Sequence, residues 1–591
     1  NPYILDFKSD TIGLQEFIWS DRRNLSEILN DKAGYFINYF GIGGRNPINY
    51  NNFDDKHIGI FRDGVQINDN FFGGFDEENI SVSEIQKIEE VSNMSSFLYG
   101  INSSGKALNI ITKDAFQPTL FSQLRYSQDR YGALFADFSL NVPFSKKFNF
   151  IFGINSHFTD GYYQNSDFNV WRGRLKLNFY SSPKLNIKTS FYHTKINRRL
   201  NYGLVYNTDD TLKNSNFAEV RDLYTYERFS NYYFDISATA NLLNDNNSLT
   251  KFIFYTNNQS RIYRNEKSGL DPNFYNHDYH YIQYVVDLKQ YFHKYFLGIY
   301  NFNFLLGANA YFNLYNFSYP HNNSLELTND PIFIQKNIYS GYFKIDLNVK
   351  NLFLSYSVKE DYVYEKFYAQ YGIESKYKII NNPDYDLKLK SGYNSTSYGI
   401  KSYFFTDYGI YNYFYEPWTK RYFEIGFEAR YKSIYLDAYN FYWSYYPFTP
   451  FSLRNGSYSI KYLSKYIDVS LNTTYYNSNN IPLIFLKSDI VYHNFFFNNK
   501  LDLRLGLSTK YFPNTMITGA FSMDNGYHPV SNDFFNMDFY VGARIGTANI
   551  NFTVANIFDK VNYTYGIYPY DARDGFLNTI ARFSIVWDFN R

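Results

Sequence analysis

The sequence predicts an all-β membrane protein: an antiparallel transmembrane β-barrel preceded by a small N-terminal α/β domain. From about residue 117 to residue 591 the chain is a succession of runs in which apolar and polar residues alternate, with no convincing helix between them. Many of these runs are ~9–14 residues long, which is enough for a tilted strand to cross a bilayer. Aromatic residues make up 22% of the chain and gather at strand ends, as in 442–446, where interfacial girdles are expected.

The alternation gives each predicted strand one apolar and one polar face. In the run 501–507 the leucines share one face, while Asp502 and Arg504 fall on the other, because successive side chains point to opposite sides of a strand. The run 172–179 places Arg172, Arg174 and Lys176 together in the same way. Such charges suit either the solvent-facing side of a soluble β-sandwich or the water-filled lumen of a membrane barrel. The number, length and aromatic ends of the runs favour the barrel.

The size of the barrel follows from the length of chain available. At roughly 21 residues for a strand and its connection, residues 117–591 provide about 22 strands, a number typical of barrels with a plugged lumen. A spanning sheet has to close on itself because lipid offers no partner to an open edge. We therefore expect the last run, 582–589, to pair with the first barrel run near residues 120–130, and the N-terminal domain to lie in the lumen.

Composition argues against several other classes of protein. Lys and Arg number 57 against 56 Asp and Glu, whereas a nucleic-acid-binding protein would carry a basic excess. The absence of cysteine excludes disulfides, zinc–thiolate sites and thiol catalysis. The sequence contains no run of ~18 apolar residues that would form a transmembrane helix, and its first residues do not read as a signal peptide. It also lacks a nucleophile elbow and a phosphate-binding loop, so we predict no catalytic residues and no enzyme activity.

Long polar connections are expected at 201–220, 264–279, 318–335 and 511–536, and the longer set of loops in such barrels is extracellular. One of them contains His277, Asp278 and His280, whose side chains are of metal-binding type. A histidine pair in a loop without further ligands usually binds no metal. We therefore predict neither a metal site nor a cofactor.

The N-terminal domain contains two local signals of structure. Residues 24–29 predict a short helix with Leu25, Ile28 and Leu29 on one face. Asp63-Gly64 stands between the apolar runs 58–61 and 65–67, which is a strong signal for a β-hairpin with a tight turn.

The motifs of this domain, in their order and spacing, resemble those of the TonB-dependent outer-membrane receptors. The helix at 24–29 followed by Ala33-Gly34 resembles the start of that family's plug domain. Asp63-Gly64 resembles its "DG" hairpin, 85–91 with 96–100 its "IE-V … LYG" segment, and 105–113 its "GG-INI-TK" close. In the barrel, 416–426 is similar to the family's "PE … YE-G" pattern and 554–560 to its "N-L-F-D-K" turn. The plug-motif residues carried over are Asp63, Gly64, Glu89, Tyr99, Gly100, Asn109 and Thr112.

The sequence also departs from the family pattern. Residues 49–52 read Asn-Tyr-Asn-Asn where the family often has "RG", and 92–94 read Ser-Asn-Met where it usually has "GP". Gly105-Lys106 replaces the last "GG". The nearest match to a TonB box, the extended segment that adds a strand to the periplasmic partner, consists of Asp10, Thr11, Ile12, Gly13 and Leu14.

The resemblance implies a division into an N-terminal periplasmic segment (1–22), a plug domain (23–116) and a transmembrane barrel (117–591). It implies a receptor in the outer membrane of a Gram-negative bacterium that imports a scarce nutrient, such as a metal–siderophore or another small chelate. The expected partners are the periplasmic domain of TonB, outer-membrane lipid and the small-molecule ligand. The apical loops of the plug are expected to bind the ligand, through Tyr39, Phe40, Arg45, Asn46, Phe71 and Phe72.

One alternative keeps the architecture but not the transport cycle. A plugged barrel without TonB coupling would serve as a structural or partner-driven component of a surface or secretion complex, and would bind another surface protein. A diffusion porin would leave the N-terminal domain without a role, and an outer-membrane lipase would need a Ser–His pair to which nothing points. The identity of the ligand is not readable from the sequence, because specificity belongs to the loops rather than to the fold.

Overall fold

The computed structural model describes residues 5–6, 10–37, 45–51, 53–71, 73–113, 119–161, 163–201, 219–220, 222–243, 248–265, 276–297, 300–318, 332–363, 365–398, 405–406, 409–410, 418–446, 453–475, 484–517, 530–558 and 579–590. In these ranges no helix combines the length and the apolar character needed to cross a membrane.

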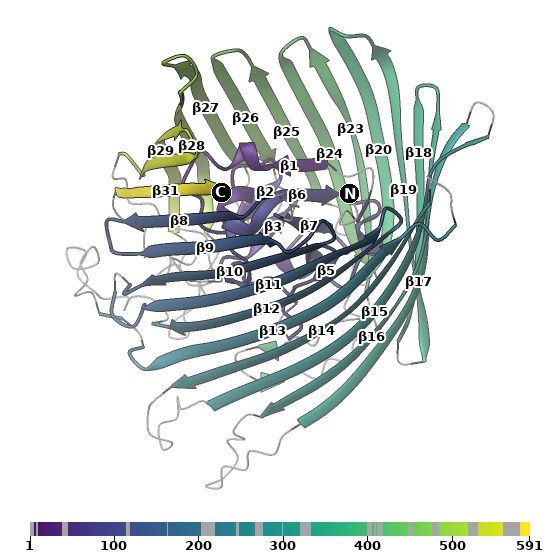
Figure 1. The fold of residues 1–591 in the computed structure, drawn as a ribbon. Coiled ribbons are helices and arrows are strands. Elements are labelled where there is room, and N and C mark those ends of the chain that lie inside the picture. Colours follow the sequence, from purple (N-terminus) through teal and green to yellow (C-terminus); the bar gives the residue numbers. More distant parts are fainter. Residues whose placement is uncertain are drawn as a thin grey trace.

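The C-terminal part of the chain forms a closed barrel of 22 antiparallel strands (Figure 1). The last strand, β31, pairs with the first, β8, and places Phe583 opposite Gln128 and Phe589 opposite Ser122. Closure leaves no strand edge facing lipid, where an unpaired N–H or C=O group would be costly. The predicted strand number and closing pair are confirmed. The barrel strands are β8 (Phe121–Asp129), β9 (Leu134–Pro143), β10 (Phe148–Thr159), β11 (Phe168–Ser182), β12 (Leu185–Arg199), β13 (Thr225–Ala240), β14 (Ser248–Asn265), β15 (Asn276–Leu297), β16 (Tyr300–Ser318), β17 (Ile332–Val349), β18 (Leu352–Val363), β19 (Lys366–Asn381), β20 (Tyr385–Tyr398), β23 (Trp418–Tyr431), β24 (Ile434–Tyr446), β25 (Leu453–Leu463), β26 (Ile467–Tyr475), β27 (Ile484–Phe496), β28 (Leu501–Ile517), β29 (Val530–Ile545), β30 (Ala548–Ala555) and β31 (Ile580–Asn590).

The wall of the barrel has a polar inner face and an apolar outer face. On β11, Arg172 and Lys176 are buried toward the lumen, whereas Leu175 and Leu177 are 38% and 47% exposed on the outside. Trp587 of β31 is likewise exposed on the outer face. The alternation in the sequence is therefore an alternation between lumen and lipid, as in membrane barrels.

The two ends of the barrel differ in the length of their connections. At one end, which we call the turn end, short segments join the strands, for example 183–184, 350–351, 432–433 and 546–547. At the other, the loop end, the strand bounds are separated by segments such as 200–224, 399–417 and 556–579. Strands β13 to β17 have 16 to 22 residues, more than the ~9–11 that a tilted strand needs to span a bilayer, so they project past it.

This projection shortens three of the predicted loops. The strand bounds leave 266–275, 319–331 and 518–529 between strands, where the sequence suggested 264–279, 318–335 and 511–536. Strand pairing continues into polar residues that no longer face lipid, so the period-2 pattern fades before the strand ends. His277 and His280 consequently lie on β15, three positions apart and on opposite faces: His277 shares the face of the buried Tyr279, while His280 is exposed.

The N-terminal domain fills the lumen, with its elements surrounded by the barrel strands (Figure 1). Its five-stranded sheet has the order β1-β6-β7-β4-β5, in which β4 and β7 are parallel. We call this domain the plug. Its elements are β1 (Asp10–Gly13), η1 (Leu14–Glu16), α1 (Leu25–Leu29), β2 (Tyr35–Ile37), β3 (Ile48–Tyr50), η2 (Asp55–His57), β4 (Ile58–Arg62), β5 (Val65–Gln66), η3 (Glu77–Asn79), η4 (Val82–Glu84), β6 (Ile85–Val91), η5 (Ser96–Leu98) and β7 (Lys106–Thr112), where η marks 3-10 helices; β2 pairs with β3, and a further small sheet joins β21 (Phe405–Thr406) to β22 (Gly409–Ile410).

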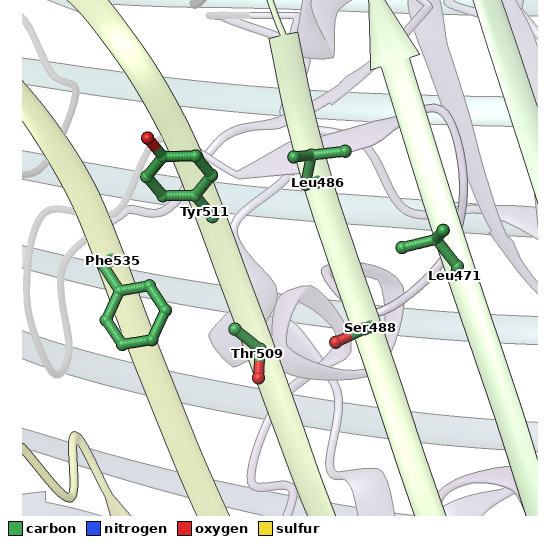
Figure 2. A pocket seen from close by; sticks show the side chains of 6 residues that line it. All are labelled: Leu471, Leu486, Ser488, Thr509, Tyr511 and Phe535. Carbon is green, nitrogen blue, oxygen red and sulfur yellow. The ribbon is translucent and has the colours of Figure 1, made fainter.

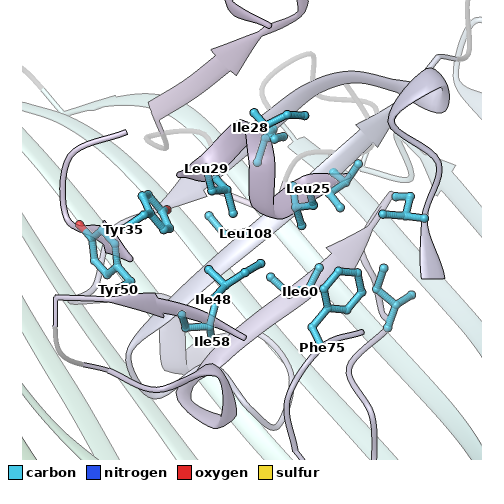
Figure 3. Packing of buried hydrophobic residues seen from close by; sticks show 14 of the residues in the cluster. Leu25, Ile28, Leu29, Tyr35, Ile48, Tyr50, Ile58, Ile60, Phe75 and Leu108 are labelled. Atoms are coloured by element: carbon cyan, nitrogen blue, oxygen red, sulfur yellow. The ribbon is translucent and has the colours of Figure 1, made fainter. Parts of the chain in front are cut away.

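The predicted helix at 24–29 is α1, and it packs on the plug sheet (Figure 3). Its N-cap is Asn24, whose side chain accepts a hydrogen bond from the Glu27 backbone N–H at 2.9 Å. Leu25, Ile28 and Leu29 are fully or almost fully buried. They join a cluster with Ile48, Ile58, Ile60 and Leu108 of the plug, and this cluster continues into barrel residues such as Tyr192 and Val285.

The plug sheet begins earlier in the chain than expected. β1 forms its edge and pairs with β6, so that Ile12 lies opposite Ile88. The sheet therefore extends into the segment 1–22, beyond the boundary at residue 23 that the sequence suggested. Four residues with one buried side chain are too few for a strand pattern to be recognised.

Candidate ligand-binding and coupling sites

Asp63 and Gly64 form the turn between β4 and β5, with φ of +50° and +91°. Both values lie in the left-handed region that this kind of hairpin turn requires. The Asp63 carboxylate accepts hydrogen bonds from the Thr112 backbone N–H at 3.0 Å and its hydroxyl at 2.6 Å. It also pairs with the Lys176 and Lys188 ammonium groups of the barrel, both at 2.9 Å. Burial opposes ionisation of this carboxyl, yet the two lysines and Thr112 hold its pKa far below the usual value.

A chain of hydrogen bonds leads from this turn to the N-terminal segment. The Gly64 backbone N–H donates to Asn109 Oδ1 at 3.0 Å, and Asn109 Nδ2 donates to Glu89 at 2.8 Å. The Glu89 carboxylate in turn accepts from the backbone N–H groups of Leu5 and Asp6, at 2.8 and 2.7 Å. The plug-motif residues from Asp63 to Glu89 thus form one network between the barrel wall and residues 5–6.

Tyr99 and Gly100 lie at a second contact between plug and wall. Lys359 of β18 donates to the Gly100 carbonyl at 3.0 Å and to the Phe97 carbonyl at 3.2 Å. Gly100 has φ +66°, and a Cβ atom there would come within 2.6 Å of Phe61 and Gln66. Tyr99 is 1% exposed and belongs to the cluster around Phe61. These motif residues therefore fix the shape of the plug.

The loop end of the plug carries a network of arginines and carboxylates. Arg198 of β12 forms a bidentate pair with Asp76, both distances being 2.7 Å. Arg261 of β14 pairs with Asp69 and with Glu227 of β13. Arg45 adds a third guanidinium, 3.4 Å from Glu227 and 3.5 Å from Asp69. Its side chain is 30% exposed, whereas the other partners are buried, so Arg45 is the member of this network that solvent reaches.

The other predicted ligand-binding residues are placed differently. Asn46 is buried and donates to the Glu77 carboxylate, which also accepts from Asn24 at 3.0 Å. Phe71 is 1% exposed, with its ring 5.3 to 5.9 Å from those of Tyr279, Tyr281 and Tyr315. Asn46 thus joins two parts of the plug, and Phe71 packs the plug against the barrel wall. Tyr39, Phe40 and Phe72 lie outside the described residues.

The predicted TonB-contact residues, 10–14, form β1 and the start of η1. The Gly13 N–H donates to Glu16 Oε1 at 2.9 Å and thus points away from β6. Because N–H directions alternate along an antiparallel strand, the N–H of Thr11 points away from β6 as well. Asp10 and Thr11 are exposed. β1 is therefore a sheet edge, whose outward N–H at Gly13 is bound by Glu16 and whose outward N–H at Thr11 is directed away from the sheet.

Charge is distributed unequally between plug and wall. Where the two meet at ion pairs, the carboxylate mostly belongs to the plug and the cation to the barrel. Sequence reasoning placed such charges on the lumen face but could not pair them, because each pair joins residues far apart in the chain. The pairs are Asp6–Lys344, Asp21–Arg125, Glu27–Arg582, Asp31–Lys510, Asp63–Lys176, Asp63–Lys188, Asp69–Arg261, Asp76–Arg198, Glu78–Arg172 and Glu84–Arg174.

Strands β18 to β27 hold the plug through other kinds of contact. The Lys420 ammonium lies 3.5 Å from the ring centre of Phe53, a cation–π geometry. Lys487 donates to the Tyr35 carbonyl at 2.6 Å. The backbone of Gly372 lies against Met94 so closely that a Cβ atom would be 1.9 Å from the Met94 carbonyl oxygen.

Hollows on the outer wall do not face the plug. One of about 380 Å³ is lined by Leu471, Leu486, Ser488, Thr509, Tyr511 and Phe535, on β26 to β29 (Figure 2). The intervening residue Lys487 points to the plug, so Leu486 and Ser488 face outward. We assign this hollow to the lipid-facing surface. Among the described residues, no group of three or more His, Asp or Glu side chains is arranged to hold a metal ion.

A closed 22-stranded barrel whose lumen holds a folded domain defines a plugged transmembrane barrel. Residues 8–106 match the family described as the TonB-dependent receptor plug domain. The chain therefore carries this plug domain inside a closed 22-stranded barrel, and the recognition made from its motifs is confirmed. Curated protein sequences provide no significant match to it.

Solved structures of the same fold cover nearly the whole chain. The ferripyoverdine receptor of the outer membrane of Pseudomonas aeruginosa, bound to ferripyoverdine, superposes with a TM-score of 0.78 at 14% identity, over 98% of this chain and 86% of that one. The siderophore receptor PirA from Acinetobacter baumannii gives 0.74 at 12% identity, over 99% and 98%. The ferric citrate transporter FecA in its unliganded form gives 0.77 at 11% identity, over 98% and 96%. Identities this low show a shared fold and nothing further.

Proposed function

We propose that the protein is a TonB-dependent receptor of a Gram-negative outer membrane that imports a metal–siderophore or another small chelate. The observation that supports this most directly is the hydrogen-bonded chain from the barrel lysines through Asp63, Asn109 and Glu89 to residues 5–6. A diffusion pore needs no folded domain tied in this way to an N-terminal segment. A receptor that is opened by pulling on that segment does.

The ligand is proposed to bind at the loop end, where the resemblance places it. Arg45 is the accessible cation of the apical network, held between Asp69 and Glu227. An anionic chelate that approaches the plug competes with these carboxylates for the guanidinium, which forms bidentate bonds with carboxylate and catecholate-like oxygens alike. Phe71 and Asn46 contribute by holding the apex in position rather than by direct contact.

The coupling partner is proposed to be the periplasmic domain of TonB, and the contact to be the edge of β1. Addition of a strand to a sheet edge uses outward-facing N–H and C=O groups, and Thr11 directs its N–H away from β6, whereas the outward N–H of Gly13 is bound by Glu16. In this proposal residues 1–22 remain the periplasmic contact segment, with residues 10–13 as its paired part.

The test is binding of the periplasmic domain of the host's TonB to the purified protein in detergent. Thr11→Pro removes one outward N–H without touching the face paired with β6, and Thr11→Val is the matched control because it keeps the N–H. We expect Thr11→Val to bind like the wild type and Thr11→Pro to bind at least tenfold more weakly. Equal binding by both variants would remove β1 from the interface. No binding by the wild-type protein would favour the plugged barrel as a structural component of a larger complex.

A further inference from the structure

The outer face of β12 to β14 carries a group of cations near the loop end. We call Lys195, Arg199, Arg228 and Arg264 the outer basic patch. Their orientation follows from their neighbours: Arg198 points into the lumen to Asp76, and Glu227 points into the lumen to Arg261. Because successive side chains of a strand point to opposite faces, Arg199 and Arg228 point outward.

Strand register brings these side chains together. Arg199 of β12 lies opposite Tyr226 of β13, which lies opposite Arg264 of β14. The guanidinium carbons of Arg199 and Arg228 lie 5.3 and 4.8 Å from the centre of the Tyr226 ring. Lys195 is paired with Trp171 of β11, whose side chain is 50% exposed.

The patch has an excess of positive charge. Arg264 has a carboxylate partner, Asp278, at 2.5 Å. For Lys195 and Arg228, both exposed, the part of the chain that the structure describes holds no carboxylate within ion-pair distance. Outward positions on other strands include apolar or neutral side chains, such as Leu314 on β16 and Tyr511 on β28, and single charges, such as Glu360 on β18 and Arg421 on β23.

The patch lies at the border of the lipid-facing surface. Toward the turn end, β11, β12 and β13 present Leu175, Phe191 and Ile236, which are 36 to 38% exposed. His193 and Tyr232, stacked at 4.2 Å, separate these apolar rows from the cations. A lipid whose acyl chains lie on the apolar rows therefore has its headgroup at the patch.

The shape of the patch indicates the kind of headgroup. From Lys195 to Arg199 it extends about 13 Å along the strand, at ~3.3 Å per residue. Amide side chains of Asn169 and Asn197 and the rings of Trp171 and Tyr226 share this surface. Lys and Arg near a membrane surface attract anionic lipids, and Arg binds phosphate through paired N–H donors. Amides and aromatic rings suit the hydroxyl groups and faces of sugars.

We propose that the outer face of β11 to β14 binds a phosphorylated glycolipid of the outer leaflet. Its phosphate groups contact Lys195, Arg199 and Arg228, its sugars lie against Trp171 and Tyr226, and its acyl chains lie on Leu175 and Phe191. The site faces away from the lumen and does not depend on the transported ligand.

The test is native mass spectrometry of the delipidated full-length protein in detergent, titrated with diphosphoryl lipid A or with phosphatidylglycerol. The variant Lys195→Gln/Arg228→Gln removes two cations of the patch. The matched control is Arg421→Gln on β23, an exposed cation that points outward because its neighbour Lys420 contacts Phe53 of the plug. Migration as a folded barrel in unheated gels verifies that each variant is intact.

We expect one tightly held lipid A on the wild type and on Arg421→Gln, and at least tenfold weaker binding by the double variant. Binding should also weaken as salt is raised, because the contact is ionic. Equal lipid A binding by the double variant and the wild type would overturn the proposal. Binding of phosphatidylglycerol as tight as that of lipid A would overturn the assignment to a glycolipid.

Discussion

Asp63 allows a quantitative test of how the plug is held. Asp63→Asn preserves the size of the side chain and, through Oδ1, the hydrogen bond from the Thr112 backbone N–H, but removes the second acceptor oxygen and the charge that Lys176 and Lys188 share. Two buried ammonium groups then lose this carboxylate. Breaking a buried ion pair by removal of one partner costs about 3–5 kcal/mol. At about 1.4 kcal/mol per factor of ten, amide exchange in β4 and β7 should become about 10²- to 10⁴-fold faster.

The assay is hydrogen exchange by mass spectrometry on plug peptides, which reports local opening without requiring the barrel to unfold. Asp54→Asn is the matched control, because the Asp54 side chain is 52% exposed. Lys176→Met and Lys188→Met, added to Asp63→Asn, should restore most of the protection by removing the uncompensated charges. Exchange in Asp63→Asn within threefold of the wild type would refute the reasoning.

Three further predictions follow from other contacts. Two lysines beside Asp63 lower the pKa of that carboxyl against the effect of burial, and His157 with Arg172 lowers the pKa of Glu78 to about 2 in the same way. The contribution of these two carboxylates to the stability of the plug is complete above the ordinary carboxyl pKa near ~4 and is lost as pH falls through the pKa of the folded state. Plug protection should thus be level from pH 7 to 5 and decline below pH ~4, and a flat profile down to pH 2 would contradict the assignment. Gly372→Ala should release the loop around Met94 to added protease, because its Cβ would overlap the Met94 carbonyl, whereas Gly173→Ala, which meets nothing within 4 Å, should not; equal cleavage of the two variants would show that the loop can shift. Arg45→Ala should weaken binding of a ferric chelate about 10- to 100-fold, which is the effect of one charge-assisted hydrogen bond. Arg130→Ala, at an exposed residue of a strand connection, should leave the affinity unchanged. Titration calorimetry with ferric citrate and ferripyoverdine measures both variants, and equal affinities would remove Arg45 from the site.

The barrel was the part of the fold most accessible from sequence. Runs such as 501–507 carry their inner and outer faces in the residues themselves, and the lengths of the runs determine the strand number. β1 was missed as part of the plug sheet because four residues cannot show a period. The predicted loop 511–536 was too long because β28 continues to Ile517, beyond the rows of residues that face lipid.

The candidate site was less accessible, for a different reason. Asp63, Asn109 and Glu89 were identified through motifs, but their partners Lys176, Lys188 and Leu5 lie far away in the chain. Phe71 was expected to face a ligand, yet it is enclosed by tyrosines of β15 and β16. Period and composition describe which face a side chain occupies, whereas burial against another element depends on the closed barrel as a whole.

The unequal division of charge between plug and wall gives the pore an ion selectivity that is concealed while the plug is in place. The carboxylates leave with any part of the plug that moves, and the cations of β11, β12 and β14 stay behind on the wall. A lumen vacated on that side becomes a positively charged corridor that draws in anions and repels free metal cations. The reversal potential of a barrel lacking the plug, measured in a planar bilayer across a salt gradient, should therefore show anion selectivity, and a cation-selective pore would contradict this view of the wall.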